Sequence, residues 1–267
     1  QRFLPGCIKG EKILAIAMTE PDAGSDLAGM RTTLREDEDH FILNGSKTYI
    51  SNGINSDYVV VAGKSDPENN PHAMTLCVVE RGMEGFERGR NLDKMGMKAQ
   101  DTAELFFNNV IIPKENVLGE VGRGFFYLMQ GLAEERLIAA VGSIASARRA
   151  FNLTREFVME RKVFGKPLSY MQNTQFKMAE MDTEIEIVEV FIDHLVAEHN
   201  EDRLTANMAA KAKLQSTEIE WKMLDLGVQL HGGAGYMKEY PICNMFTDAR
   251  INRILAAILA VSLSSLC

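Results

Sequence analysis

Two stretches of the sequence combine residue types that could do chemistry, and the first is Met18–Asp26. It ends the apolar run Ile13–Met18 and carries hydroxyls at Thr19 and Ser25, together with a Pro and a Gly. Gly lets a ligand approach the backbone, and Pro restricts the turn. The pattern indicates a strand end that offers hydroxyl and N–H groups to a polar, flat or anionic ligand, although an ordinary strand-to-loop transition fits equally. The stretch contains no Lys and no Gly-x-Gly-x-x-Gly follows it, which excludes a P-loop and a dinucleotide-binding turn.

The second stretch is the charged cluster Glu134-Glu135-Arg136, within a run of helical character. Leu132, Ile138 and Ala139 place apolar side chains one turn or less from Glu135. Apolar surroundings raise the pKa of a carboxylate and make it a stronger base once water is excluded. On these residues taken by themselves, an exposed charge cluster on a helix surface is the favoured interpretation.

Composition restricts the classes of partner. The chain has 267 residues, 46% hydrophobic and 25% charged, with a net charge of -8. This profile is typical of water-soluble globular proteins, and the negative charge argues against nucleic acid or an anionic membrane as a partner. The longest apolar run, Ile254–Val261, is too short to span a bilayer, so an integral membrane protein is not expected. The cysteines are scattered without metal-ligand spacing, so no metal site is predicted.

The elements that must position the first stretch are predicted to be strands. Apolar runs of strand length, separated by turn-rich segments, occupy Ile13–Met18, Phe41–Tyr49, Tyr58–Ala62, Met74–Val79 and Thr102–Phe107. Because no helical pattern separates them, they predict an antiparallel, barrel-like sheet rather than β-α-β units.

The second stretch is predicted to lie on the first of several long helices that follow Pro113. Apolar residues recur at helical spacing over Gly124–Met159, Leu168–His199, Leu204–Leu230 and Pro241–Leu263. Long helices with short connections predict an up-down four-helix bundle, so the fold class is α+β. The expected division is a linker or remnant over 1–10, a β domain over 11–117 and a helical domain over 118–267.

These motifs resemble those of the acyl-CoA dehydrogenases, flavoenzymes that desaturate acyl thioesters. Ala17–Gly29 resembles the first signature of that family, and Gln229–Tyr236 resembles the second. The resemblance continues in order and spacing almost to the C-terminus, and Met97–Phe107 is most similar to the long-chain branch. It implies a central β domain and a C-terminal four-helix domain, without the family's N-terminal helical domain. Two departures are Asn244, where a basic residue is usual, and the apolar Ile254–Val261, where the family has polar residues.

The resemblance also implies residue roles. FAD would contact the ends of two strands, a helix terminus and a glycine-rich segment: Ile16, Ala17, Met18, Thr19, Ser25, Tyr49, Ile50, Ser51, Arg161, Phe164, Gln172, Gln229, Gly232 and Gly233. Acyl-CoA would contact Ser25, His72, Phe126, Ala133, Glu134 and Arg136. Each segment also has a purely structural interpretation: an Asn-Gly turn after Ser51, cations at a helix C-terminus near Arg161, and a glycine-rich helix cap after His231.

The resemblance assigns the catalytic base to Glu135. Most family members keep this base in the last helix, but Ile254–Ile258 contains no carboxylate. The long-chain and isovaleryl types keep it on the first helix of the bundle directly before an Arg, as Glu135 stands before Arg136. The implied function is α,β-dehydrogenation of long-chain acyl-CoA to trans-2-enoyl-CoA in fatty acid β-oxidation.

Further properties are implied by the resemblance. Electrons would pass to an electron-transfer flavoprotein, the assembly would be a homo-oligomer (a dimer of dimers), and the location would be the mitochondrial matrix. Two other interpretations stay open at this point. One is an isovaleryl-type branched-chain enzyme, which shares the base position, and the other is a non-catalytic, truncated relative that acts as a binding or scaffold protein.

Overall fold

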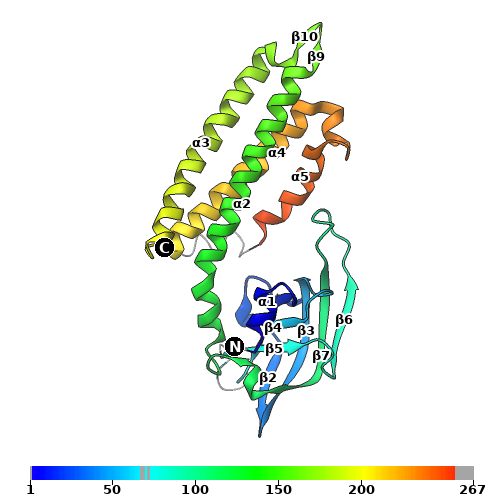
Figure 1. Cartoon of the computed structure of the whole chain (residues 1–267), viewed down its shortest axis with the longest axis vertical. Helices are drawn as coiled ribbons and strands as arrows, with labels where there is room; N and C mark the ends of the chain where they lie inside the picture. Colours follow the sequence, from blue (N-terminus) through cyan, green and yellow to red (C-terminus); the bar gives the residue numbers. More distant parts are fainter. Residues whose placement is uncertain (1, 67–69, 71–72, 256–267) are drawn as a thin grey trace. The chain divides into compact units, whose positions relative to one another are not determined.

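The computed structural model describes residues 2–66, 70 and 73–255, which divide into two compact units (Figure 1). The sheet unit comprises Gln1–Lys94 and Lys98–Gln130. The helical unit comprises Met95–Met97 and Gly131–Cys267.

Within the described residues, the sheet unit is built on one eight-stranded sheet. The strands follow the order β6-β7-β3-β2-β4-β5-β8, and β1 pairs with β4 beside this path. Their bounds are β1 Leu14–Ala17, β2 Thr33–Asp37, β3 His40–Ser51, β4 Tyr58–Lys64, β5 Met74–Glu80, β6 Phe86–Asn91, β7 Thr102–Pro113 and β8 Val117–Leu118. A short helix, α1 (Leu4–Ile8), lies where the sequence predicted a linker or remnant, and the neighbouring Phe3 ring packs edge-on against Tyr58.

The sheet corrects the prediction of an antiparallel barrel in two respects. First, β1 runs parallel to β4, with Leu14 opposite Tyr58, so the sheet is mixed. Second, the strand path has two ends, β6 and β8, which do not pair with each other in the described part of the chain. Closing a barrel needs end strands long enough to share a ladder. β8 has two residues, and both already pair with β5.

The core of the sheet unit follows the alternation of the strands. In β3, Phe41 and Leu43 are buried and Ile42 between them is half-buried. β5 is buried along almost its whole length, which explains its continuous apolar run. Phe41 and Leu43 join residues of β4, β5 and β7 in one buried cluster that fixes the sheet, among them Val59, Val61, Cys77, Val79, Leu105 and Ile112.

The helical unit is built on α2 (Gly124–Glu160, which begins in the sheet unit), α3 (Gln172–Asn200) and α4 (Ala206–His231). Buried apolar residues of all three share one core, among them Ala140, Ile185 and Met223. The fourth predicted helix is shorter than expected, because α5 spans Pro241–Ala249 and a 3-10 turn over Arg250–Arg253 follows it. The last predicted positions, 256–263, lie outside the described residues.

The loop between β3 and β4 is anchored on a buried carboxylate, Asp101. Its side chain accepts hydrogen bonds from the Ile54 N–H at 2.7 Å and from the Asn55 amide at 2.8 Å. Its carbonyl accepts the Asn52 N–H at 3.2 Å. A charged acceptor with several donors is strong, so this loop is held rigidly against the residue that precedes β7.

We expect Ile185→Ala to destabilise the helical unit by about 2–5 kcal/mol, because it leaves a cavity in a closely packed core. Ile185 is 0% exposed on α3, whereas Ile187 on the same helix is 64% exposed. The matched variant Ile187→Ala should change stability by about 0.5 kcal/mol or less. Urea unfolding followed by circular dichroism compares the two, and equal losses would contradict this orientation of α3.

We expect Asp101→Ala to speed hydrogen–deuterium exchange of the backbone over 52–55 by about tenfold or more, because the Ile54 N–H loses its partner. Mass spectrometry of a peptide that spans the loop measures the rate. Asp93→Ala is the control, since Asp93 pairs with Lys98 at an exposed position. Unchanged exchange in Asp101→Ala would show that the anchor does not limit the motion of the loop.

Candidate functional site

The first predicted stretch begins where β1 ends, and its geometry is a tight turn. Ala17 is 0% exposed and Ile16 is 44% exposed, as expected for a strand with one covered face. Beyond the strand, the Glu20 N–H donates to the Ala23 carbonyl at 2.8 Å, and the reverse bond measures 3.2 Å. Met18 and Thr19 are half-buried just before this turn, and Ser25 is exposed just after it.

The second predicted strand end, Tyr49–Ser51, contains a β-bulge. The pairing of β3 with β7 shifts between Lys47 and Ile50, and Tyr49 has a φ of 58°. A left-handed backbone is uncommon for an aromatic residue, and bulges re-aim side chains beside functional sites. Here Ile50 is 3% exposed and Tyr49 is 69% exposed, so the bulge turns the ring away from the core. Ser51 is exposed after it.

The sheet unit brings these two strand ends together. The Thr48 N–H donates to the Thr19 carbonyl at 2.9 Å, which joins the residue before Tyr49 to the first stretch. Further along, the Asn52 side-chain amide donates to the Leu14 carbonyl at 3.4 Å. The predicted cofactor residues Ile16–Thr19 and Tyr49–Ser51 are therefore neighbours, although more than 25 positions separate them in the sequence.

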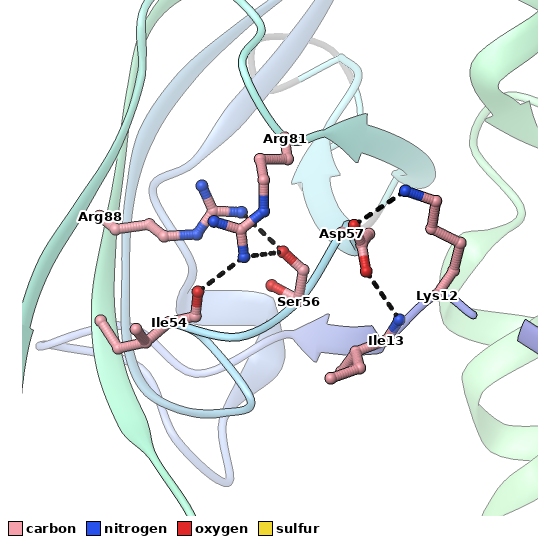
Figure 2. A network of polar contacts seen from close by, with 7 residues as sticks. All are labelled: Lys12, Ile13, Ile54, Ser56, Asp57, Arg81 and Arg88. Atoms are coloured by element: carbon pink, nitrogen blue, oxygen red, sulfur yellow. Dashed lines mark hydrogen bonds and ion pairs between the residues drawn. The ribbon is translucent and has the colours of Figure 1, made fainter. Parts of the chain in front are cut away.

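Two arginines fix the loop that follows Ser51 (Figure 2). Arg81 donates to the carbonyls of Ile54 and Ser56 at 2.8 and 2.7 Å. Arg88 donates to the carbonyls of Gly53 and Ser56 at 2.9 and 3.0 Å. Burial and the nearby charge of Arg81 lower the pKa of Arg88. Asp101 therefore accepts a hydrogen bond from an N–H group of this loop, and the two arginines donate to its C=O groups.

A carboxylate at the end of the same loop anchors the start of β1 (Figure 2). Asp57 accepts the Ile13 N–H at 3.0 Å and the Lys12 ammonium group at 3.0 Å. The Ile13 N–H and then Lys12 hold the pKa of Asp57 below its ordinary value. These contacts link the start of β1 to the loop that follows β3. The strand that leads to Thr19 and the loop that follows Ser51 are therefore held by the same network.

Glu135 lies on α2 in the helical unit, and its side chain is exposed. Partial desolvation raises the pKa of Glu135, and the charge of the adjacent Glu134 adds to the increase. A carboxylate with a raised pKa is a better base than an ordinary Glu. Ala133 is half-buried and Glu134 is exposed. Arg136 is 3% exposed, so it belongs to the interior of the helical unit.

The predicted nucleotide-binding residues of the helical unit gather at one end of it. Arg161 follows α2 directly, and Phe164 lies at the tip of the hairpin formed by β9 (Lys162–Val163) and β10 (Lys166–Pro167). Phe164 has a φ of 50° and is 97% exposed. Gln172 is exposed at the first position of α3, just beyond this hairpin.

The glycine-rich segment after α4 meets the same end of the helical unit. The ring of His231, the last residue of α4, stacks on Phe157 of α2 with ring centroids 4.2 Å apart. Its Nδ1 lies 2.7 Å from the Gly227 carbonyl, and burial lowers the pKa of His231. Gly232 and Gly233 follow, and a Cβ at either would meet no atom within 4 Å. Gln229 is exposed, so this segment offers open backbone beside the end of α2.

The remaining predicted residues are more scattered. Phe126 belongs to the sheet unit, is 47% exposed and lies under the Arg123 guanidinium group at 4.9 Å. His72 lies outside the described residues, as does most of Ile254–Val261; Ile254 and Leu255 are exposed.

In the described part of the chain, no group of three or more His, Cys, Asp or Glu could hold a metal ion. None of the described helices is long and apolar enough to cross a membrane.

Sequence reasoning missed the residues that support the two strand ends. They are Glu20, Lys47, Arg81, Arg88 and Asp101. The sequence pattern gives little indication that these residues are buried or support the site, because charged residues in or beside a strand are usually exposed. Glu20 and Lys47 are 5% and 1% exposed, and an ion pair buried this deeply cannot be told from the sequence pattern.

The comparison with known proteins covers nearly the whole chain. A family model described as acyl-CoA dehydrogenase, middle domain, matches residues 15–110, and one described as acyl-CoA dehydrogenase, C-terminal domain, matches residues 122–256. The chain is 46% identical over 256 residues to the mitochondrial long-chain specific acyl-CoA dehydrogenase of Mus musculus, covering 95% of this chain and 60% of the relative. It is 35% identical over 254 residues to the mitochondrial isovaleryl-CoA dehydrogenase of Solanum tuberosum, covering 95% and 62%.

Solved structures are similar as well. The crystal structure of an acyl-CoA dehydrogenase from Geobacillus kaustophilus matches with a TM-score of 0.97 at 45% identity, covering 99% of this chain and 70% of that chain. The crystal structure of an acyl-CoA dehydrogenase complexed with FAD from Bacillus anthracis matches with a TM-score of 0.91 at 30% identity, covering 98% and 48%. The chain spans about 60% of the length of the curated relatives it matches. With both family models matched in order and such relatives along almost its entire length, the chain belongs to the acyl-CoA dehydrogenase family.

Proposed function

We propose that the protein is an FAD-dependent dehydrogenase that converts long-chain acyl-CoA to trans-2-enoyl-CoA in fatty acid β-oxidation. The observation that carries this proposal is Glu135, a carboxylate of raised pKa that directly precedes a buried Arg. Its role is to take the proton from the carbon next to the thioester carbonyl. When bound, FAD supplies the acceptor for the hydride that leaves the neighbouring carbon.

The exposed groups of the sheet unit fit a flavin ring. Tyr49 offers a flat aromatic face that the bulge keeps out of the core. Thr19 and Ser51 add hydroxyls at the two strand ends, beside Ile16, Ala17, Met18 and Ile50. In this proposal these residues hold and orient the ring system, and Ser25 contacts both the cofactor phosphate and the substrate.

The exposed end of the helical unit fits the nucleotide half of FAD. Arg161 matches phosphate oxygens with a planar, permanently charged fork. Phe164 offers a fully accessible ring for the adenine, and Gln172 and Gln229 add amides. The empty space around Gly232 and Gly233 leaves room for close approach of a ligand to the backbone. The family resemblance suggests that these residues serve the FAD of a neighbouring subunit, which makes a homo-oligomer, a dimer of dimers, part of the proposal.

The substrate assignment rests on the relatives and on exposed residues. Identity is higher to the long-chain enzyme than to the isovaleryl enzyme, 46% against 35%, which favours long-chain acyl-CoA. Three predicted substrate residues are at least partly accessible and can contact the acyl-CoA: Phe126, Ala133 and Glu134. The buried Arg136 would act instead by supporting the helical turn that carries Glu135. His72 stays a proposed contact to the CoA moiety. An isovaleryl-type substrate is the second candidate, because it shares the position of the base.

The wider setting is proposed from the family. Electrons would pass to an electron-transfer flavoprotein, and the location would be the mitochondrial matrix; the name of the mouse relative describes that protein as mitochondrial. The proposed division is a β domain over 11–117 and a helical domain over 118–267, preceded by a linker or remnant over 1–10.

An absorbance scan tests the function directly. The protein loaded with FAD should lose its flavin absorbance on addition of a long-chain acyl-CoA, and much less on addition of isovaleryl-CoA. The reverse order would favour the branched-chain enzyme. Bound flavin that neither substrate bleaches would favour a non-catalytic binding protein, and failure to bind FAD would refute the proposal.

We expect Glu135→Gln to abolish dehydrogenation while FAD binding persists, because Gln cannot accept the proton. A lost general base costs about 100- to 10,000-fold in rate. Rapid-mixing measurement of flavin bleaching gives the rate, and the flavin spectrum reports binding. Glu156→Gln, at an exposed position of the same helix, is the matched control and should leave the rate unchanged. Near-normal turnover of Glu135→Gln would rule out this base.

We expect Glu134→Gln to move the acid limb of the pH–rate profile to lower pH. The negative charge of Glu134 raises the pKa of Glu135, so its removal lowers that pKa and keeps the base deprotonated at more acidic pH. Activity falls as pH falls through the pKa of the base in both proteins, and the variant loses it later. The profile of kcat/KM measures the shift, with Glu156→Gln as control. A limb that stays in place would show that Glu135 does not set it.

A further inference from the structure

The sheet unit buries an ion pair directly beneath the end of β1. The Lys47 ammonium group lies 2.8 Å from Glu20 Oε1, and the two side chains are 0% and 4% exposed. Removing two charges from water is costly, and well-packed apolar residues can often replace such a pair without loss of stability. Stability alone therefore does not account for the pair, and its hydrogen bonds to the backbone show what it positions.

Glu20 fastens the first stretch to the start of β2. Its Oε2 accepts the Arg31 N–H at 2.6 Å, and its Oε1 accepts the Thr32 N–H at 3.0 Å as well as the Lys47 ammonium. The carboxylate thus fills its acceptor sites with backbone and ammonium donors. It holds the segment after Thr19 against a second, distant part of the chain.

Lys47 acts on the peptide just before Thr19. Its ammonium group donates to the Met18 carbonyl at 2.9 Å, in addition to its bond with Glu20. In a planar trans peptide the C=O and the following N–H point in opposite directions. Because Lys47 draws the Met18 carbonyl toward the interior, the Thr19 N–H is turned away from it.

The Thr19 N–H is left available. The Thr19 carbonyl accepts the Thr48 N–H, so the peptides on both sides of Thr19 are fixed. Yet among the hydrogen bonds of the described residues, none takes up the Thr19 N–H. A donor that is held in one orientation and has no partner is suited to a ligand.

We propose that the Lys47–Glu20 pair is a positioning device that aims the Thr19 N–H at the flavin. The pair does not touch the cofactor itself; Lys47 sets the direction of the Met18–Thr19 peptide, and Glu20 holds Lys47 in place and secures the turn that follows. This inference rests on the proposed function, since it requires FAD at the sheet unit.

A double variant isolates this role from the role of the pair in folding. Lys47→Met with Glu20→Gln leaves no charge of the pair buried, keeps a carbonyl acceptor for one of the two N–H groups of Arg31 and Thr32, and removes the donor to the Met18 carbonyl. Glu20→Gln by itself keeps Lys47 and that donor. Lys114→Met is the matched control, because Lys114 pairs with Glu36 at 2.9 Å in an exposed position of the same unit.

The measurement is reconstitution of the FAD-free protein, followed by flavin fluorescence and visible absorbance, with circular dichroism to verify folding. The double variant should bind FAD about 10- to 100-fold more weakly, the equivalent of one lost charge-assisted hydrogen bond, and the band shape of the bound flavin should change. Glu20→Gln keeps the Lys47 donor but removes the carboxylate that holds it, so it should weaken FAD binding by a smaller factor than the double variant does. Lys114→Met should match the unmodified protein. A folded double variant with unchanged affinity and spectrum would overturn the inference, and so would equal weakening in Glu20→Gln.

Hydrogen exchange of the unmodified protein gives a second test that no folding defect can obscure. The Thr19 N–H should exchange rapidly without FAD and become protected when FAD binds. Protein that binds FAD without any change at Thr19 would overturn the inference and leave the proposed function standing. Protein that binds no FAD at all would overturn both.

Discussion

The hydrogen bond from the Thr48 N–H to the Thr19 carbonyl is the link on which the sheet unit's arrangement depends. It joins a strand end near the start of the chain to one that precedes a bulge in β3. β1 ends at Ala17, before Thr19, and the pairing of β3 with β7 is interrupted after Lys47 and resumes at Ile50, so neither segment is held at this point by a regular ladder. Asp101, Arg81 and Arg88 hold the loop on one side of the link, and Lys47 with Glu20 holds the turn on the other side. The polar groups that are available to a ligand are thus held in place by side chains that would not contact the ligand.

Two charged sites, the Lys47–Glu20 pair and Glu135, differ in how far they are removed from water. The sheet unit places a Lys–Glu pair in its interior, where each partner satisfies the other and several backbone groups. The helical unit leaves Glu135 exposed, and its pKa is raised by partial desolvation and by a neighbour of like charge. The first arrangement favours rigidity, because both charges would be costly without their partners. The second favours proton transfer, because a base works best when its charged form is not strongly stabilised.

Much of this architecture could be predicted from the sequence, and the misses have physical causes. Apolar runs of strand length revealed β1, β3, β4, β5 and β7, whereas β2 and β6 were missed because their charged residues and Gly89 hide the strand pattern. Helical periodicity located α2, α3 and α4, but the end of α5 at Ala249 has no Pro or Gly to mark it. Whether the sheet closes into a barrel and whether β1 pairs in parallel both depend on contacts between residues distant in the sequence. Local sequence patterns do not reveal such contacts.

The candidate site divides in the same way. The family resemblance of short motifs named Thr19, Tyr49 and Glu135 as candidate site residues, and their roles stay predictions. The residues that support them were not found, because Lys47 and Asp101 become distinctive only through burial and through partners many positions away. The exposure of Glu135 and the burial of Arg136 follow from helix geometry, in which neighbouring positions point about 100° apart.

The bulge at Tyr49 makes the length of β3 as important as its composition. Side chains of a strand alternate between its two faces, and one additional residue reverses that alternation from there onward. Before the bulge, Leu43 and Lys47 face inward at odd positions; after it, Ile50 does so at an even one. A deletion between Lys47 and Ile50 would restore a regular ladder and exchange the inward and outward positions. The number of residues between Lys47 and Ile50 therefore decides which side chains of the end of β3 are buried.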